Sequence, residues 1–108
     1  MKNDPLLSLL GLMRKAGRLT LGFDAVVESA KKGESSLILI ASDISERSAR
    51  QLAFECRETA VQIISIAYDM LEISRSVGRQ VRILSINDEG FAKKALSLID
   101  KIEEESDI

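Results

Sequence analysis

Apolar residues recur at helical spacing in two segments near the start of the chain, and glycines separate these segments. The first segment opens at Asp4-Pro5, where proline suits the first turn of a helix, and it ends at Gly17. The second follows Gly22 and is closed by Gly33. The positions predicted to face inward are Leu6, Leu9, Leu10 and Met13 in the first helix and Phe23, Val26, Val27 and Ala30 in the second.

Two further helices are predicted from capping patterns, in which an aspartate is followed three residues later by a glutamate. Asp43 with Glu46 predicts the start of a third helix, and Asp69 with Glu72 predicts a fourth helix, which stops at Gly78. The positions expected to be buried are Ala49, Leu52, Ala53 and Cys56 in the third helix and Met70, Ile73 and Val77 in the fourth.

Short apolar runs between the helices predict strands. An extended piece lies around Leu19-Thr20, and Leu37 to Ala41 is continuously aliphatic, which is typical of a strand covered on both faces. Val61 to Ala67 and Val81 to Ile86 predict two more strands. The alternation of helix and strand therefore predicts an α/β fold, a three-layer α/β/α sandwich with a small, mostly four-stranded mixed sheet.

The last helix is expected to begin at Asn87 or Asp88, with an apolar stripe formed by Phe91, Ala95, Leu98, Ile99 and Ile102. Its acidic end, residues 100–108, is expected to fray. This end holds five of the acids of a chain whose formal net charge is only −2, so the rest of the chain is mildly basic. Residues 1–108 are short enough to form a single domain.

The residue inventory argues against an enzyme. The chain has no histidine, which removes the commonest general base and metal-binding nitrogen, and its glycines form no phosphate-binding loop motif. We therefore expect no catalytic residues, no metal and no cofactor. A hydrolase that uses only carboxylates is the remaining enzymatic alternative, but the acids here lie mostly at helix caps and on helix exteriors.

The single cysteine, Cys56, rules out an internal disulfide framework and favours a reducing, cytoplasmic location. We expect Cys56 to be part of the core. The longest uninterrupted apolar run, Leu37 to Ala41, is far shorter than the roughly 20 residues of a membrane-spanning helix, so no membrane partner is expected.

Basic residues gather in two turns of the predicted fold. Arg14, Lys15 and Arg18 follow the first helix and lead to the Gly22 helix start, where unpaired backbone N–H groups favour an anion. Arg75, Arg79 and Arg82 bracket Gly78, and arginine is suited to phosphate contacts and to stacking on bases. Taken alone, these groups are better explained as solvated loop charges. The functional interpretation requires the two turns to lie side by side at one edge of the sheet.

Four stretches and the opening helix resemble the L7Ae family of ribosomal proteins, most of all its short bacterial members. The stretches are residues 22–33 (GFDAVVESAKKG), 37–43 (LILIASD), 73–78 (ISRSVG) and 87–92 (NDEGFA), together with Leu10-Gly11-Leu12 and the turn Arg14-Lys15-Ala16-Gly17-Arg18. The resemblance covers about residues 6 to 99. It implies an α/β/α sandwich and, because many members bind RNA kink-turns, a protein that binds structured RNA, including ribosomal RNA, and associates with the ribosome. No DNA partner is expected.

The resemblance also implies where RNA would bind. The Gly22 helix start would meet the bent RNA, and the turn from Gly78 to Val81 would cover an extruded base. Combined with the basic turns, the predicted RNA-binding residues are Arg14, Lys15, Arg18, Gly22, Phe23, Asp24, Arg75, Gly78, Arg79, Gln80, Val81 and Arg82.

The chain departs from the family's pattern at three positions in the helix that follows Gly22 and at one pair before Gly78. The strongest kink-turn binders of the family carry Gly-x-Asn-Glu-x-x-Lys, but here Asp24, Ala25 and Glu28 stand at the last three specified positions, and Ile73-Ser74 replaces a Leu-Gly pair. Glu28 would place a negative charge where the lysine approaches phosphate. The alternative hypothesis is therefore a protein-interaction module that keeps the fold and has lost kink-turn recognition.

Overall fold

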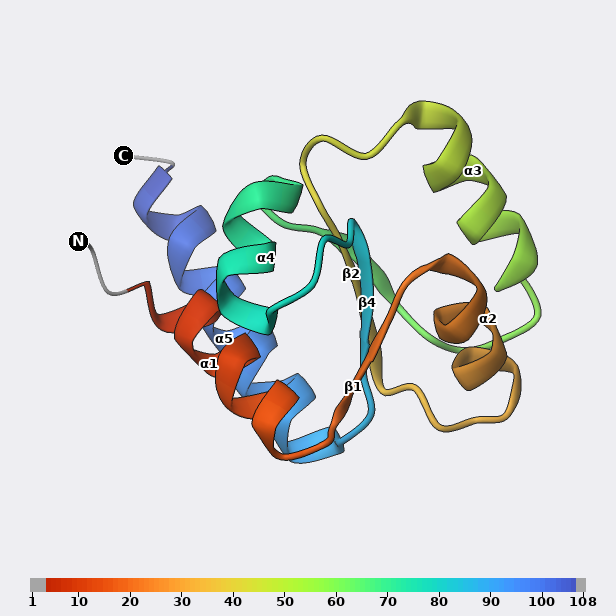
Figure 1. The fold of residues 1–108 in the computed structure, drawn as a ribbon, viewed down its shortest axis with the longest axis horizontal. Helices are drawn as coiled ribbons and strands as arrows, with labels where there is room; N and C mark the ends of the chain where they lie inside the picture. Colours follow the sequence, from red (N-terminus) through yellow and green to blue (C-terminus); the bar gives the residue numbers. More distant parts are fainter. Residues whose placement is uncertain (1–3, 107–108) are drawn as a thin grey trace.

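Five helices and four strands alternate along the chain in the computed structural model, which describes residues 4–106 (Figure 1). The elements are α1 (Pro5–Lys15), β1 (Leu19–Leu21), α2 (Phe23–Lys31), β2 (Leu37–Ile40), α3 (Glu46–Glu55), β3 (Ile63–Ser65), α4 (Met70–Val77), β4 (Ile83–Ile86) and α5 (Glu89–Ser106). This is the predicted order. Within the described residues, no helix combines the length and the apolar character needed to cross a membrane.

The strands form one mixed sheet in the order β1-β4-β2-β3. The strand β4 is antiparallel to both of its neighbours, whereas β2 and β3 run parallel. In the β1–β4 pair, Leu19 lies opposite Ile86 and Leu21 lies opposite Leu84. β1 and β3 are consequently the edge strands.

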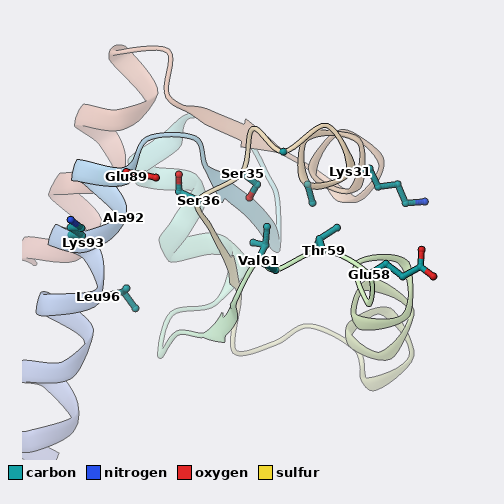
Figure 2. Close-up of a pocket in the computed structure, with 13 residues that line it drawn as sticks. Lys31, Ser35, Ser36, Glu58, Thr59, Val61, Glu89, Ala92, Lys93 and Leu96 are labelled. Atoms are coloured by element: carbon teal, nitrogen blue, oxygen red, sulfur yellow. The ribbon is translucent and has the colours of Figure 1, made fainter.

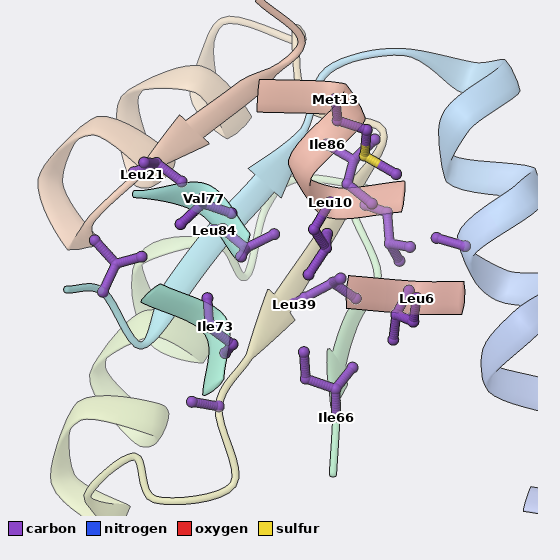
Figure 3. Packing of buried hydrophobic residues seen from close by; sticks show 14 of the residues in the cluster. Leu6, Leu10, Met13, Leu21, Leu39, Ile66, Ile73, Val77, Leu84 and Ile86 are labelled. Atoms are coloured by element: carbon purple, nitrogen blue, oxygen red, sulfur yellow. The ribbon is translucent and has the colours of Figure 1, made fainter. Parts of the chain in front are cut away.

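Helices cover both faces of the sheet. Figure 1 shows α1, α4 and α5 on one side and α2 and α3 on the other. The buried side chains accordingly form two clusters. The larger one joins α1, α4 and α5 to one face of the sheet and includes Leu6, Leu10, Met13, Leu39, Ile73, Val77, Leu84 and Ile86 (Figure 3). The smaller one contains Val26, Val27, Ala30, Ile38, Leu52, Cys56 and Ile83.

The strand β2 shows why the sequence pattern there is continuously apolar. Leu37 and Leu39 belong to the larger cluster, whereas Ile38 between them belongs to the smaller one. All three side chains are buried. Successive residues of a strand face opposite sides, so both sides must be apolar when helices cover both. The three-layer α/β/α sandwich is therefore confirmed.

The predicted start of the third helix is wrong. Ser45, not Asp43, is the N-cap of α3, because the Ser48 N–H donates to the Ser45 hydroxyl at 3.1 Å. Two of the four predicted inward positions are also wrong, since Ala53 is exposed and Ala49 only half-buried. The other two, Leu52 and Cys56, are buried.

The other helix termini agree better with the sequence. Both hydrogen bonds of the Asp69–Glu72 capping box form, and α4 ends at Gly78 as predicted, although Met70 is only half-buried. At the start of α5 the Phe91 N–H donates to the Asp88 carboxylate at 2.8 Å, so Asp88 is the cap. The neighbouring Asn87 instead binds the side chains of Thr20 and Ser85, at 2.6 and 2.7 Å.

The predicted strands are longer than the observed ones. Regular pairing covers only Ile63–Ser65 in β3 and begins at Ile83 in β4. The helix α5 continues to Ser106, through most of the acidic segment that we expected to fray. The side chain of Ile102 and residues 107–108 lie outside the described part of the chain.

Candidate nucleic-acid interface

The junction of β1 and α2 is built around Gly22. Its φ of 95° and ψ of 156° lie in a region that only glycine adopts readily, which lets the chain turn directly from the edge strand into the helix. Its N–H donates to the Ile83 carbonyl at 3.0 Å, which fixes the junction beside the start of β4. Gly22 has no side chain to cap α2, so the first N–H groups of the helix lack that partner and favour an anion.

Arg79 reaches this junction from the turn between α4 and β4. Its Nη2 atom lies 3.7 Å from the position that a Cβ atom on Gly22 would occupy. The turn itself starts at Gly78, whose N–H donates to the Ser74 carbonyl at 2.8 Å and ends α4. The helix start and the α4–β4 turn, the two places where the family resemblance implies RNA binding, therefore meet.

A pocket of about 440 Å³ opens between the same two segments. Gly22 and Phe23 form one wall, and Gln80, Val81 and Arg82 form another. The β2–α3 loop, α3, α4 and the start of β4 complete the lining with Asp43, Ile44, Ser45, Ser48, Met70 and Ile83. Five of the predicted site residues thus line one hollow. We call the set formed by Gly22, Phe23 and residues 79–82 the Gly22–Arg79 surface.

Asp43 is the functional candidate that the sequence analysis missed. One carboxylate oxygen lies 3.3 Å from Nε of Arg82, and the other accepts the Met70 N–H at 3.0 Å. Both side chains of the ion pair remain partly exposed, Asp43 at 39% and Arg82 at 45%. Arg82 is thus partly neutralised and held against the pocket wall. The sequence did contain a signal: Asp43 follows β2, and Arg82 precedes β4. Because β2 and β4 are antiparallel neighbours, the end of one strand lies beside the start of the other.

The outer side of α2 carries the residues that depart from the family pattern. Asp24, Ala25 and Glu28 are all exposed. Glu28 forms an ion pair with Lys32, one helical turn further on, at 2.7 Å. The hydrogen bond and charge of Lys32 lower the pKa of Glu28, and Glu28 raises the pKa of Lys32. Glu28 therefore keeps its negative charge near neutral pH, and Lys32 offsets part of it.

The other basic turn, between α1 and β1, does not lie at the Gly22 junction. Arg14, Lys15 and Arg18 are exposed, but they lie at the opposite end of β1 from Gly22. The Asn87 N–H donates to the Arg18 carbonyl at 2.9 Å, so Arg18 lies beside the end of β4, whereas Gly22 lies beside its start. The extended chain rises by four steps from Arg18 to Gly22, about 13 Å at the usual rise per residue.

The remaining predicted residue, Arg75, is exposed on the last turn of α4.

A second, larger hollow of about 680 Å³ lies at the far end of α2, between α2, the α3–β3 segment and α5 (Figure 2). Lys31, Ser35, Thr59 and Lys93 are among its lining residues, and none of the predicted site residues lines it. The described residues also contain no group of three or more His, Cys, Asp or Glu side chains placed to hold a metal ion.

Known proteins with the same architecture include RNA-binding proteins. The chain is 29% identical over 93 residues to the RNA-binding protein YlxQ of Bacillus subtilis, which covers 85% of this chain and 92% of that protein. It is 26% identical over 94 residues to RNA-binding protein YlxQ of Enterococcus faecium, covering 87% and 90%. These relatives are named for binding RNA and not for a catalysed reaction.

Solved structures show the same fold. A protein of unknown function from Bacillus halodurans superposes with a TM-score of 0.82 at 27% identity, over 91% of this chain and 99% of that one. The 15.5kD RNA binding protein of Giardia lamblia superposes with a TM-score of 0.69 at 17% identity, over 95% and 92%. The family model described as ribosomal protein L7Ae/L30e/S12e/Gadd45 matches residues 4–96. The chain therefore belongs to the ribosomal protein L7Ae/L30e/S12e/Gadd45 family.

Proposed function

We propose that this protein binds a sharply bent, structured RNA of the kink-turn type through the Gly22–Arg79 surface. The observation that carries the proposal is the approach of Arg79 to Gly22, with Nη2 3.7 Å from the position of a Cβ there. It joins the helix start and the α4–β4 turn into one surface. Membership of the family and the names of the YlxQ relatives support RNA as the class of partner.

The chemistry of the surface suits irregular RNA. The N–H groups at the start of α2 and the Arg79 guanidinium are donors for phosphate oxygens. The adjacent pocket combines apolar walls, such as Phe23 and Val81, with the Gln80 amide. Proteins recognise RNA mainly where bases are splayed out of the duplex, because the major groove of regular A-form RNA is too narrow for side chains. A bent RNA offers both features together.

The acids on α2 set the strength of the interaction. Glu28 and Asp24 are exposed beside the surface, and they oppose the approach of phosphate. Lys32 lies 2.7 Å from Glu28 and partly offsets its charge. We therefore expect the native chain to bind more weakly than family members that carry lysine at the position of Glu28. These acids are also the observation that favours the competing proposal, a protein-interaction module on the same fold.

Two finer parts of the proposal concern cellular context. We propose that the RNA partner is ribosomal RNA or a ribosome-associated RNA, which rests on the family's composition. We also propose a cytoplasmic location. The support for it is the single cysteine, Cys56, which is buried and free.

The proposal is tested by measuring the affinity of a fluorescently labelled kink-turn RNA and of a fully paired duplex of equal length. Three proteins are compared: the native chain, Arg79→Gln, and Arg47→Gln as a control with the same charge change on exposed α3. We expect the native chain and the control to prefer the kink-turn, and Arg79→Gln to lose roughly tenfold or more in affinity for it. Equal affinity of the native chain for both RNAs would refute the kink-turn assignment. If the native chain binds neither RNA, the protein-interaction alternative is favoured.

A further inference from the structure

The basic residues of the α1–β1 turn, Arg14, Lys15 and Arg18, are left unused by the Gly22–Arg79 surface. The backbone of Arg18 lies about 13 Å from Gly22 along β1, at the rise of an extended chain. That distance is too long for one phosphate group to contact both places. If this turn has a ligand, it is a different segment from the one at Gly22.

The charge of this turn is not neutralised within the described part of the chain. The ion pairs found there engage Lys31, Lys32, Arg50 and Arg82, and none involves the three residues of the turn. Two acids, Asp88 and Glu89, lie nearby at the start of α5, because Asn87 is hydrogen-bonded to Arg18. The Asp88 carboxylate is occupied by the Phe91 N–H.

The turn is also sterically open. A Cβ atom added at Gly17 would meet nothing within 4 Å, and the flanking side chains of Lys15 and Arg18 are exposed. Favourable contact with the carboxyl end of the α1 dipole explains Arg14 and Lys15, which lie in the last turn of the helix. It does not explain Arg18, which lies beyond the helix end.

We propose that the α1–β1 turn is a second RNA contact, which holds the phosphate backbone of a duplex arm flanking the bend that binds at the Gly22–Arg79 surface. This inference rests on the proposed function. The turn offers three exposed cations and none of its residues lines either hollow described above, so it suits phosphate oxygens rather than base edges. Its effect is to raise affinity for any RNA whose arm reaches the turn, without adding sequence preference. The edge strand β1 sets the spacing of the two contacts.

The experiment compares a variant that neutralises the turn with one that removes the same charge elsewhere. The first is Arg14→Gln/Lys15→Gln/Arg18→Gln. The matched control is Arg47→Gln/Arg50→Gln/Arg57→Gln, which lies in and just after α3 on the other face of the sheet. Affinities are measured across a salt series for a kink-turn RNA with two long arms and for two versions in which one arm is cut short. Circular dichroism confirms that both variants are folded.

We expect the turn variant to bind the long-armed RNA roughly tenfold or more weakly, and the slope of log affinity against log salt to shrink by about two to three. Shortening one particular arm should abolish the difference between the turn variant and the native chain. The α3 control should match the native chain throughout. An equal loss in the α3 control, or a turn variant with unchanged affinity and slope, would overturn the inference.

Failure of this inference is distinguishable from failure of the proposed function because Arg79→Gln is measured in the same series. If Arg79→Gln weakens binding and the turn variant does not, the Gly22–Arg79 surface stands and the second contact is refuted. If only the turn variant weakens binding, the turn is an RNA contact and the proposed main surface is wrong. If the native chain binds neither long-armed nor short-armed RNA, both proposals are refuted.

Discussion

Arg79 lies against Gly22 although the two residues are 57 positions apart in the sequence. Its Nη2 atom is 3.7 Å from the position that a Cβ at Gly22 would occupy. The contact links the β1–α2 junction to the α4–β4 turn. It depends on the backbone conformation of Gly22, which other residues avoid.

Gly22→Ala should therefore impair both folding and binding. The strained backbone should cost about 1–3 kcal/mol of unfolding free energy, measured by urea denaturation. The new methyl group would stand 3.7 Å from Nη2 of Arg79, an ordinary contact distance, so the affinity for a kink-turn RNA should fall because the strained junction shifts and not because Arg79 is displaced. The matched control is Gly33→Ala, which also has a positive φ (77°) but no atoms within 4 Å of its Cβ position. The control should lose stability and keep its RNA affinity; a matching loss of affinity in the control would contradict this reading of Gly22.

Glu28→Lys should raise the affinity for a kink-turn RNA several-fold. The substitution replaces a negative charge on the exposed side of α2 with a positive one, beside the surface that phosphate approaches. It also breaks the ion pair with Lys32 and places two cations one helical turn apart, so a small loss of helix stability should accompany the gain. Equilibrium titration of labelled RNA at moderate salt measures the effect.

The control for this change is Glu46→Lys, which alters the charge by the same amount and breaks a comparable ion pair, with Arg50 on α3. It should leave RNA affinity nearly unchanged. If Glu46→Lys and Glu28→Lys raise the affinity equally, net charge alone governs binding and the position of Glu28 has no special role.

Gly11→Ala should destabilise the protein although alanine is the better helix former. Gly11 lies where α1 packs against α4, and a Cβ there would be 3.1 Å from the Ser76 carbonyl oxygen. Backbone cannot yield easily, so we expect a net loss of about 1–3 kcal/mol, larger than the gain of about 1 kcal/mol in helix propensity. Thermal and urea unfolding measure it. Ser8→Ala, at an exposed position of the same helix, is the control, and stabilisation by Gly11→Ala would show that the helices separate freely.

Tyr68 should make the protein sensitive to alkaline pH. Burial raises the pKa of Tyr68, and so does its hydrogen bond to the Asp4 carboxylate. The folded state thus favours the protonated phenol. The resulting stability is fully present below the unfolded pKa of about 10 and is lost as the pH rises toward the higher folded pKa.

The chain has one tyrosine and no tryptophan, so tyrosinate absorbance reports Tyr68 alone. We expect the native chain to titrate at a higher pH than the urea-unfolded chain. Tyr68→Phe should be less stable near neutral pH, because it loses the Asp4 contact, and its stability should depend less on pH above 10. Coincident titration of the folded and unfolded chains would show that Tyr68 is solvated.

Local patterns were good guides to the helices and poor guides to contacts between distant segments. The Asp69–Glu72 capping box is confirmed because both of its hydrogen bonds are local. The same pattern at Asp43 and Glu46 was misleading, since the Asp43 carboxylate is bound instead by Met70 and Arg82, which are 27 and 39 residues away. Such partners depend on tertiary packing, which residue spacing alone does not contain.

The site was predictable in part for the same reason. The resemblance indicated both Gly22 and the turn after Gly78, and the structure brings them together. Only three residues separate Arg18 from Gly22 in the sequence, yet the basic α1–β1 turn does not lie at the Gly22 junction. Strand β1 is extended between them, and because it pairs antiparallel with β4, its first residue lies beside the end of β4 and its last residue lies toward the start of β4. Neighbours in sequence can thus be separated by the length of a strand.

The most direct test of the account is to titrate isotopically labelled protein with a kink-turn RNA and follow its backbone amide resonances by NMR. We predict that the largest shifts fall on residues 22–24 and 78–82, and that the amides at the far end of α3, residues 52–55, shift little. Shifts concentrated on α3 or on the hollow beside Lys31 and Lys93, with none at Gly22 and Arg79, would contradict the account.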